Sequence, residues 1–331
     1  MKVCILNQRE VKDLLSLREC IGVMEQVFLD IAAGNIVLPI RTVMNIPGGS
    51  VLGLMPSYNG ETASFGAKVV SVFPSNHGTE YDAHQGVVLL YEAEHGCLQA
   101  IVDATAITGV RTAAVSAAAT RILANPDAGH LAILGAGVQA YAHLQAMRIV
   151  RDLKMISVWS IYPEETVRFA ERARREIGVH VNPCDSAEAA VNGADLICTT
   201  TPAREPILRG DWIAPGAHIN AIGACTAVNR ELDTAAVKKA KLFVDSTASA
   251  RAEAGDFVIP LREGAIGESH IRGELGEVLS GKKEGRSSGR DITLFKGVGL
   301  SLQDLAAARY VYGRAEKKKV GIWTEIGGLR D

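Results

Sequence analysis

The feature that most constrains this chain is a glycine turn set between an apolar strand and a helix. Residues 131–134 are all apolar, as in a buried parallel strand, and the spacing Gly-x-Gly-x-x-Ala follows at Gly135, Gly137 and Ala140. Apolar residues then recur at helical spacing over 141–150. Gly135 permits the tight turn, Gly137 lets a pyrophosphate approach the backbone, and Ala140 lets the helix pack closely on the strand. An ordinary strand–helix turn is the alternative, but the complete unit favours dinucleotide binding.

Length and composition limit the class of protein. A chain of 331 residues predicts two domains, and 47% hydrophobic with 22% charged residues is typical of a globular protein with a sizeable core. The net charge of −2 argues against nucleic acid and anionic membranes as partners. The six cysteines show no paired spacing, which indicates reduced thiols in a cytoplasmic protein without a metal site. We see no signal peptide, and no apolar run approaches the ~20 residues of a membrane helix.

The first part of the chain predicts an α+β domain with a mixed or antiparallel sheet. A helix is expected after the capping residue Asn7, and another over 17–33 that ends at Gly34. The expected strands are 3–6, a pair within 37–54 around the turn 47–49, 66–73, and the hairpin strands 86–91 and 98–102. The Ala- and Thr-rich segment 104–124 is expected to be a helix that crosses between domains.

From residue 130 the pattern alternates between strand and helix, which predicts a Rossmann-like, doubly wound parallel sheet. The expected strands are 131–134, 156–160, 179–181, 196–200, 219–222, 242–245 and 292–295, with helices at 164–177 and 186–192. A helix over 302–312 is expected to return to the first domain. The predicted domains are therefore 1–118 with 302–331, for substrate binding and dimerisation, and 119–301 for the dinucleotide.

Ordered motifs along the whole chain give it a family resemblance. They lie at 41–42, 54–56, 66–68, 84–86, 108–114, 135–141, 216–223, 230–233, 253–256 and 294–299. On these motifs the chain resembles the ornithine cyclodeaminase/mu-crystallin family, and it is most similar to the mu-crystallin branch, whose members are ketimine reductases. The resemblance implies a homodimer formed through the N-terminal domain, with a small imino or amino acid bound between that domain and the nicotinamide.

The resemblance also implies a substrate site built on cations. Arg41, Lys68 and Arg111 match positions that grip the α-carboxylate of the substrate, and guanidinium and ammonium groups suit that task. A solvated surface charge is the ordinary alternative for each, but Lys68 lies inside the apolar run 65–73, where a charge needs partners or a cleft. Lys68 is the candidate proton donor, with water as the alternative. The resemblance also places Cys225 and Glu253 near the substrate. The ordinary alternatives are a packing role for Cys225 and a surface charge for Glu253.

The implied cofactor is NAD(P)H. Its predicted contacts are His84, Thr112, Gly135, Ala136, Gly137, Val138, Gln139, Ser160, Ile161, Tyr162, Thr201, Pro202, Ile222, Val298 and Gly299. The strand that ends at Ser160 is followed by neither the acidic residue that binds the 2′-hydroxyl of NAD nor the arginine that favours NADP. We interpret this end as favouring dual or NADPH use. For the strand-end residues, plain packing remains the alternative.

Two departures from the family pattern bear on the reaction. Cyclodeaminases carry an aspartate where this chain has Cys225, and a glutamate for the distal amine where it has Gly53. A thiol with an ordinary pKa near ~8.5 does not replace a carboxylate base. The sequence therefore predicts reduction of a small cyclic ketimine carboxylate, such as Δ1-pyrroline-2-carboxylate or Δ1-piperideine-2-carboxylate. The alternatives are a cyclodeaminase-type lyase, an alanine-like amino-acid dehydrogenase, and a binding protein for NADPH and a small ligand.

Overall fold

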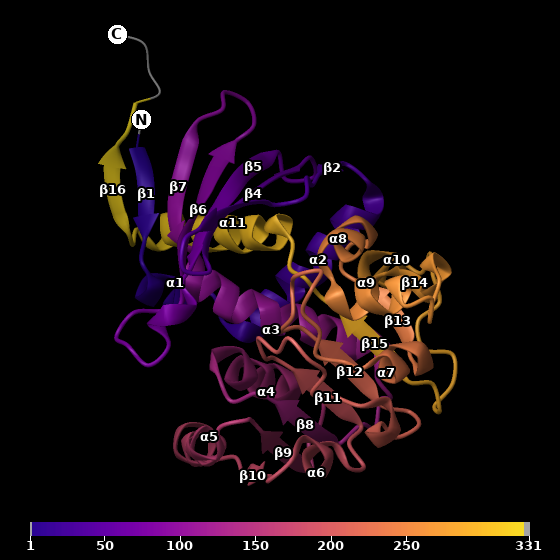
Figure 1. The fold of residues 1–331 in the computed structure, drawn as a ribbon. Coiled ribbons are helices and arrows are strands. Elements are labelled where there is room, and N and C mark those ends of the chain that lie inside the picture. Colours follow the sequence, from indigo (N-terminus) through magenta and orange to yellow (C-terminus); the bar gives the residue numbers. More distant parts are fainter. Residues whose placement is uncertain (1, 328–331) are drawn as a thin grey trace. The chain divides into compact units, whose positions relative to one another are not determined.

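A computed structural model describes residues 2–327, and its internal contacts divide the chain into two units (Figure 1). The first unit runs to Arg111 and resumes at Leu300; the second is Thr112–Gly299. The sequence placed these divisions at 118/119 and 301/302. The chain passes between the units twice, inside helix α3 (Ala104–Leu123) and at the Gly299–Leu300 bond. Among the described residues no helix has the length and apolar character to span a membrane.

The first unit holds a mixed eight-stranded sheet in the order β16-β1-β7-β6-β5-β4-β2, with β3 paired to β4. Its strands β1 and β7 are parallel and the other neighbours antiparallel, as a mixed sheet requires. The strands are β1 (Lys2–Leu6), β2 (Ile36–Val37), β3 (Thr42–Ile46), β4 (Ser50–Asn59), β5 (Ser64–Val72), β6 (His84–Glu92), β7 (Leu98–Asp103) and β16 (Ile322–Glu325). The predicted hairpins around 47–49 and 94–96 are confirmed.

Helices α1 (Gln8–Leu14), α2 (Leu17–Ala33) and α11 (Ser301–Lys318) belong to the same unit. Asn7 and Ser16 each form a capping box, so both predicted helix starts are confirmed. Gly34 takes a φ of +90° at the end of α2, a left-handed conformation that glycine adopts without strain. Helix α11 packs on β4, β5 and β6 and on α2, so the C-terminal segment completes the first unit.

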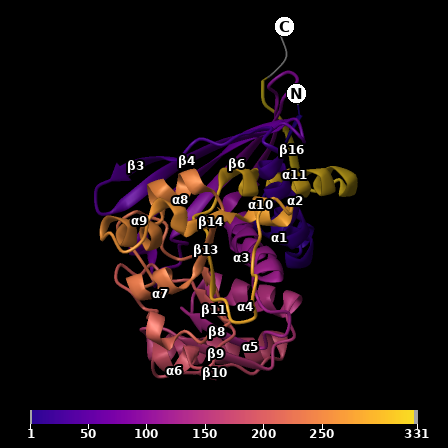
Figure 2. The same ribbon diagram turned by 90° about the vertical axis from the view of Figure 1, so that its right-hand side faces the viewer.

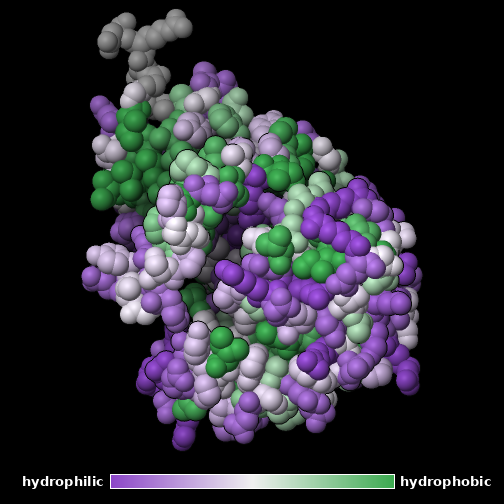
Figure 3. Space-filling view, viewed as in Figure 1, coloured by the Kyte–Doolittle hydropathy of each residue, from purple (hydrophilic) through white to green (hydrophobic). Residues whose placement is uncertain are grey.

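The register of the sheet gives its two faces different roles. One row across the strands reads Met55, Lys68, Val88, Val102 and Leu6, all buried on the face that α11 covers. The neighbouring row lies on the opposite face, is half-exposed or exposed, and is apolar throughout: Pro56, Ala67, Leu89, Ile101, Ile5 and Ile322. Figure 3 shows hydrophobic side chains gathered where Figure 1 places β16, β1 and β7.

The second unit is a parallel eight-stranded sheet in the order β10-β9-β8-β11-β12-β15-β13-β14, which confirms the doubly wound fold. Figure 2 shows its helices on both sides of the strands. The strands are β8 (His130–Leu134), β9 (Met155–Trp159), β10 (Asn182–Pro183), β11 (Leu196–Thr199), β12 (His218–Ala221), β13 (Lys241–Val244), β14 (Ile271–Glu274) and β15 (Thr293–Lys296). The expected strand at 179–181 is wrong, because the chain joins the sheet only at Asn182, after Gly178 has ended the preceding helix.

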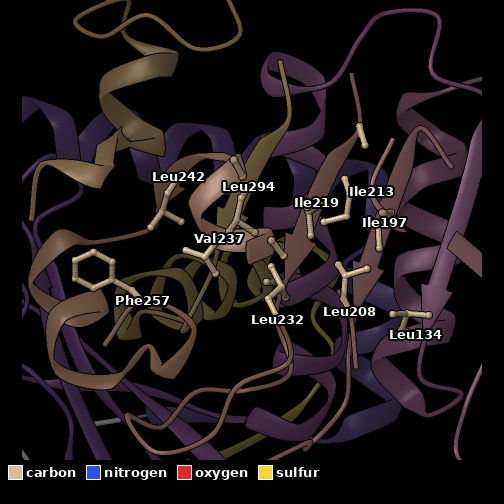
Figure 4. Close-up of a cluster of buried hydrophobic side chains, with 14 of the residues drawn as sticks. Leu134, Ile197, Leu208, Ile213, Ile219, Leu232, Val237, Leu242, Phe257 and Leu294 are labelled. Carbon is tan, nitrogen blue, oxygen red and sulfur yellow. The ribbon is translucent and has the colours of Figure 1, made fainter. Parts of the chain in front are cut away.

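The strands are joined by α4 (Val138–Val150), α5 (Pro163–Ile177), α6 (Ala187–Val191), α7 (Thr234–Lys239), α8 (Thr247–Glu253), α9 (Gly255–Arg262) and α10 (Leu275–Leu279). The sequence pattern did not predict α7 to α10 or β14, which are short and lack clear periodicity. Figure 4 shows the core on one side of the sheet, where Leu134, Ile197 and Ile219 of the strands meet side chains of the covering segments. This packing fixes the carboxyl ends of β8, β11 and β12, where the dinucleotide turn lies.

Candidate active site

A cluster of buried charges lies in the first unit, under the sheet. Nζ of Lys68 donates to Oγ1 of Thr108 at 2.6 Å and lies 3.3 Å from Oδ1 of Asp304. Nε of Arg111 donates to the same carboxylate oxygen at 3.0 Å. Lys68 is 2% exposed and Asp304 is fully buried, so one carboxylate holds two cations away from water. Residues of β5, α3 and α11 thus meet at one point.

The first turn of α11 supplies the polar half of this cluster. Oε1 of Gln303 accepts from Nη1 of Arg111 at 3.1 Å and from the backbone N–H of Leu300 at 3.3 Å. Sequence reasoning missed both Gln303 and Asp304, which follow one another at the start of a predicted helix. Polar residues in a first helical turn are common caps, so only their burial against the sheet identifies them. The two arrange the cations that the sequence predicted.

The charged groups in this cluster shift the pKa values of their neighbours. Burial lowers the pKa of Lys68 to about 8, and Arg111 and Arg41 lower it too, while Asp304 opposes the shift. Burial alone would raise the pKa of Asp304, but Arg111 and Lys68 hold it below its usual range. Arg41 is half-buried just before β3, near enough for its charge to act on Lys68. Lys68 and Arg111 share the single carboxylate of Asp304, and this leaves excess positive charge, which suits an anionic ligand.

His84 begins β6 and is half-buried in the same unit. Burial and, to a lesser degree, the charge of Lys68 lower its pKa to about 4, so the ring is neutral at physiological pH. Its backbone carbonyl accepts from Oγ1 of Thr105 on α3 at 3.1 Å. The ring therefore adds no charge to the cationic cluster. Its expected contact with the cofactor stays a prediction.

In the second unit, the glycine turn has the shape that a pyrophosphate requires. Gly135 has a φ of +119°, and a Cβ there would lie 2.7 Å from Oγ1 of Thr200. A Cβ on Gly137 would meet no protein atom within 4 Å, so the space in front of the turn is open. Gly137 is also the N-cap of α4 without a side-chain cap, and Val138 is 69% exposed. The first amides of α4 can therefore receive an anion, and these residues fit a dinucleotide.

A pocket of about 560 Å³ lies where β9 and β10 end. It is lined by Trp159, Ser160, Ile161, Pro163, Thr166, Val167, Pro183, Cys184 and Asp185. Ile161 and Tyr162 are 66% and 46% exposed, so neither serves the core. The position at the end of the second strand is the usual place for the adenosine ribose.

A second buried charge network supports the ends of β11 and β12, and sequence reasoning missed it. One oxygen of the Glu231 carboxylate accepts from the N–H of Thr201 at 2.7 Å, and the other accepts from the N–H of Gly223 at 2.8 Å. Burial raises the pKa of Glu231. The carboxylate thus holds the loop of Thr201 and Pro202 to the loop after Ile222.

Lys296, at the end of β15, is the cation of this network. Its Nζ lies 2.9 Å from Oδ2 of Asp256 and donates to the carbonyl of Ala224. Oδ1 of Asp256 accepts from the N–H of Glu231 at 2.8 Å. Glu231, Asp256 and Lys296 lie in motifs on which the family resemblance rests. Nothing else in the sequence marks these three residues as parts of a site.

The remaining predicted site residues also lie in the second unit. Cys225 is exposed, and its Sγ lies 3.6 Å from the carbonyl oxygen of Gly223. Glu253 ends α8 and is half-buried. The N–H groups of Val298 and Gly299 donate to Oδ2 of Asp245 at 2.9 and 2.8 Å. The structure thus gathers Arg41, Lys68 and Arg111 in one unit and the glycine turn with the strand ends in the other.

A model of the ornithine cyclodeaminase/mu-crystallin family matches residues 1–319. The ketimine reductase mu-crystallin of Mus musculus is 40% identical over 280 residues, which cover 84% of this chain and 85% of that protein.

Two solved structures are similar over nearly the whole chain. Thermococcus litoralis Δ1-pyrroline-2-carboxylate reductase, in complex with NADH and L-proline, is 36% identical with a TM-score of 0.94 over 98% of this chain and 100% of that chain. An archaeal alanine dehydrogenase dimer with bound NAD is 32% identical with a TM-score of 0.93 over 99% and 100%. The motifs, the fold and these matches agree: the chain belongs to the ornithine cyclodeaminase/mu-crystallin family.

Proposed function

We propose that this protein reduces a small cyclic ketimine carboxylate, such as Δ1-pyrroline-2-carboxylate or Δ1-piperideine-2-carboxylate, to the cyclic amino acid. It is an NAD(P)H-dependent imine reductase. The observation that carries the proposal is the buried cluster in which Asp304 holds Lys68 and Arg111 side by side. A carboxylate-bearing imine needs an anion site next to a proton donor, and this cluster supplies both groups.

Each residue of the cluster has a task in this reaction. Arg41 and Arg111 bind the substrate carboxylate, for which a guanidinium is well shaped. Lys68, with a pKa of about 8, is largely protonated at neutral pH and gives its proton to the imine nitrogen. Asp304 positions both cations and keeps Lys68 from losing its proton at still lower pH. When bound, the reduced nicotinamide would supply the hydride for the imine carbon, and with the proton from Lys68 this would convert the C=N bond into a secondary amine.

The turn at Gly135 and Gly137, together with the start of α4, which has no side-chain cap, would hold the cofactor's pyrophosphate. Thr201, Pro202, Ile222, Val298 and Gly299 would hold the nicotinamide half, with Glu231 and Asp245 fixing their loops. By resemblance, His84 and Thr112 are proposed contacts of the cofactor and Glu253 a proposed contact of the substrate. The neighbouring structures bind NADH or NAD, whereas the sequence favoured dual or NADPH use.

Cys225 and Gly53 separate reductase from lyase. Gly53 has no side chain and so offers no charge to the distal amine of ornithine, and a Cβ added there would lie 3.3 Å from Cγ1 of Val70. Dehydrogenation of an alanine-like amino acid is a related reaction, and one relative of this chain is named alanine dehydrogenase. A binding protein is the candidate of another class, and the complete cationic cluster speaks for turnover instead.

The apolar outer face of the first unit supports a homodimer. The half-exposed row of Ala67, Leu89, Ile101 and Ile5 would be covered by the same face of a second copy. Light scattering at micromolar concentration should give the mass of a dimer, and Leu89→Glu should give a folded monomer. Arg168→Glu, on the exposed side of α5, is the control and should remain dimeric.

We also place the protein in the cytoplasm, because all six cysteines stand as free thiols.

The direct test is turnover. Purified protein should oxidise NADH or NADPH with Δ1-pyrroline-2-carboxylate or Δ1-piperideine-2-carboxylate, and Lys68→Met should lose this activity while still binding the dinucleotide. Efficient ammonia release from ornithine would replace the reductase with a lyase. Tight binding of both imines without turnover would leave a binding protein.

A further inference from the structure

We propose that Asp185 selects NADH over NADPH, by accepting a hydrogen bond from the adenosine ribose and repelling a 2′-phosphate. The proposal rests on the proposed dinucleotide function and names which dinucleotide the site takes. It differs from the preference suggested by the residues at 160–162, where the sequence offers no carboxylate.

The register of the sheet brings this carboxylate to the ribose position from the neighbouring strand. Strand β10 runs parallel to β9, with Pro183 opposite Val158, and the N–H of Cys184 donates to the carbonyl of Val158 at 2.8 Å. The next residue, Asp185, therefore leaves the sheet beside Ser160. Both residues line the same pocket of about 560 Å³. Asp185 is exposed, and thus its carboxylate is open to a ligand.

The turn after β9 is already occupied by its own hydrogen bonds. Oγ of Ser160 donates to the carbonyl of Tyr162 at 3.0 Å and accepts from the N–H of Tyr162 at 3.1 Å. The N–H of Ser160 donates to Oγ1 of Thr166 at 3.0 Å. These bonds fix the turn and leave Ser160 little capacity for a ligand. Recognition of the ribose falls to Asp185.

The charge around the pocket disfavours a second phosphate. Among the described residues that line it, none is a lysine or arginine, and the one charged side chain is Asp185. The first turn of α5 adds Glu164 and Glu165. A 2′-phosphate would carry about two negative charges at neutral pH, by analogy with other phosphate monoesters. Among the described residues that line the pocket it would meet the carboxylate of Asp185 and no lysine or arginine, whereas the 2′-hydroxyl of NADH donates a hydrogen bond to an acidic residue.

The test uses two nucleotide fragments that need no turnover. Calorimetry should show that the wild type binds 5′-AMP at least about tenfold more tightly than 2′,5′-ADP, which differs from it only by the 2′-phosphate, in line with a charge-assisted hydrogen bond. Asp185→Asn should shrink this ratio about tenfold, and Asp185→Arg should reverse it. Glu188→Gln removes an exposed carboxylate of α6 that does not line the pocket, and it should leave the ratio unchanged.

The outcomes separate the two levels of the proposal. Equal binding of both fragments by the wild type, or an unchanged ratio in a folded Asp185→Asn protein, overturns the role of Asp185 while the dinucleotide site stands. If the wild type binds neither 5′-AMP nor NADH nor NADPH, the proposed dinucleotide function itself is overturned. Thermal melting of each variant establishes that it is folded, and Asp185→Asn keeps the size of the side chain.

Discussion

Arg111 and Asp304, which are far apart in the sequence, are both buried and are joined by a hydrogen bond of 3.0 Å from Nε to Oδ1. Oε1 of Gln303 holds a second nitrogen of the same guanidinium. The orientation of Arg111 is therefore set before any substrate arrives. Such preorganisation lowers the cost of binding, since little side-chain freedom remains to be lost.

Arg111→Ala should reduce kcat/KM for the ketimine about 30-fold or more, because removing one partner of a buried ion pair costs about 2–5 kcal/mol. Arg111→Lys keeps the charge but not the planar fork, and it should lie between the alanine variant and the wild type. Steady-state kinetics with Δ1-pyrroline-2-carboxylate, together with thermal melting, check this. Normal ketimine kinetics in a folded Arg111→Ala enzyme would contradict the proposed carboxylate site.

The affinity for a carboxylate should fall as the pH rises through about 8, where Lys68 loses its charge. Pyrrole-2-carboxylate is a suitable probe because it has no group of its own that titrates near this pH. In Asp304→Asn the fall should come at lower pH, since the carboxylate opposes the shift of the Lys68 pKa. A binding profile that is flat from pH 6 to 10 would exclude Lys68 from the site.

The Lys68 ammonium group also makes the free energy of unfolding depend on pH. The pKa of Lys68 is about 8 in the fold against an ordinary value of 10.5, so between these pH values the unfolded chain binds more protons than the folded one. The contribution of Lys68 to the free energy of unfolding therefore rises with pH across this window and is lost as the pH falls through it. Lys68→Met should remove this dependence, as denaturant titrations at pH 8 and pH 10 can measure.

Gly137→Val should abolish NAD(P)H binding and leave the melting temperature nearly unchanged. The new side chain would enter the space in front of the turn, where no protein atom lies within 4 Å. Gly135→Ala is the contrasting variant: its Cβ would meet Thr200 at 2.7 Å in a backbone conformation that disfavours side chains, so it should lower the melting temperature. Unchanged NAD(P)H affinity in Gly137→Val, measured by calorimetry, would remove the dinucleotide interpretation of this turn.

Cys225→Ser should keep much of the ketimine reductase activity, because hydride delivery and carboxylate binding need no base at this exposed position. The wild type should release ammonia from ornithine at no useful rate. Parallel assays of both proteins with ornithine and with Δ1-pyrroline-2-carboxylate decide this. A large loss in Cys225→Ser would assign the thiol a direct role.

The cations and the glycine turn were predictable because each stands out locally: Lys68 is a charge within an apolar strand, and Gly135 and Gly137 lie between a strand and a helix. Their buried partners were not. Asp304 and Glu231 have no local pattern that distinguishes them from surface carboxylates, and their roles depend on residues far away in the chain. The strand expected at 179–181 was misplaced for the same reason, because pairing with a distant strand decides which residues join the sheet. Asn182 pairs with Ser157 and Pro183 pairs with Val158.

The strand order carries a consequence for synthesis of the chain. Strand β15 lies between β12 and β13, although it is made after both, so the dinucleotide sheet has a gap until Lys296 has left the ribosome. The first sheet likewise waits for α11, which brings Asp304 to the cations, and for β16 at its edge. Multidomain chains often fold their N-terminal domain first during translation. Here the second unit lacks a strand until residue 296 has been made and the first unit until residue 325, so the nascent chain must keep two unfinished sheets from pairing with wrong partners.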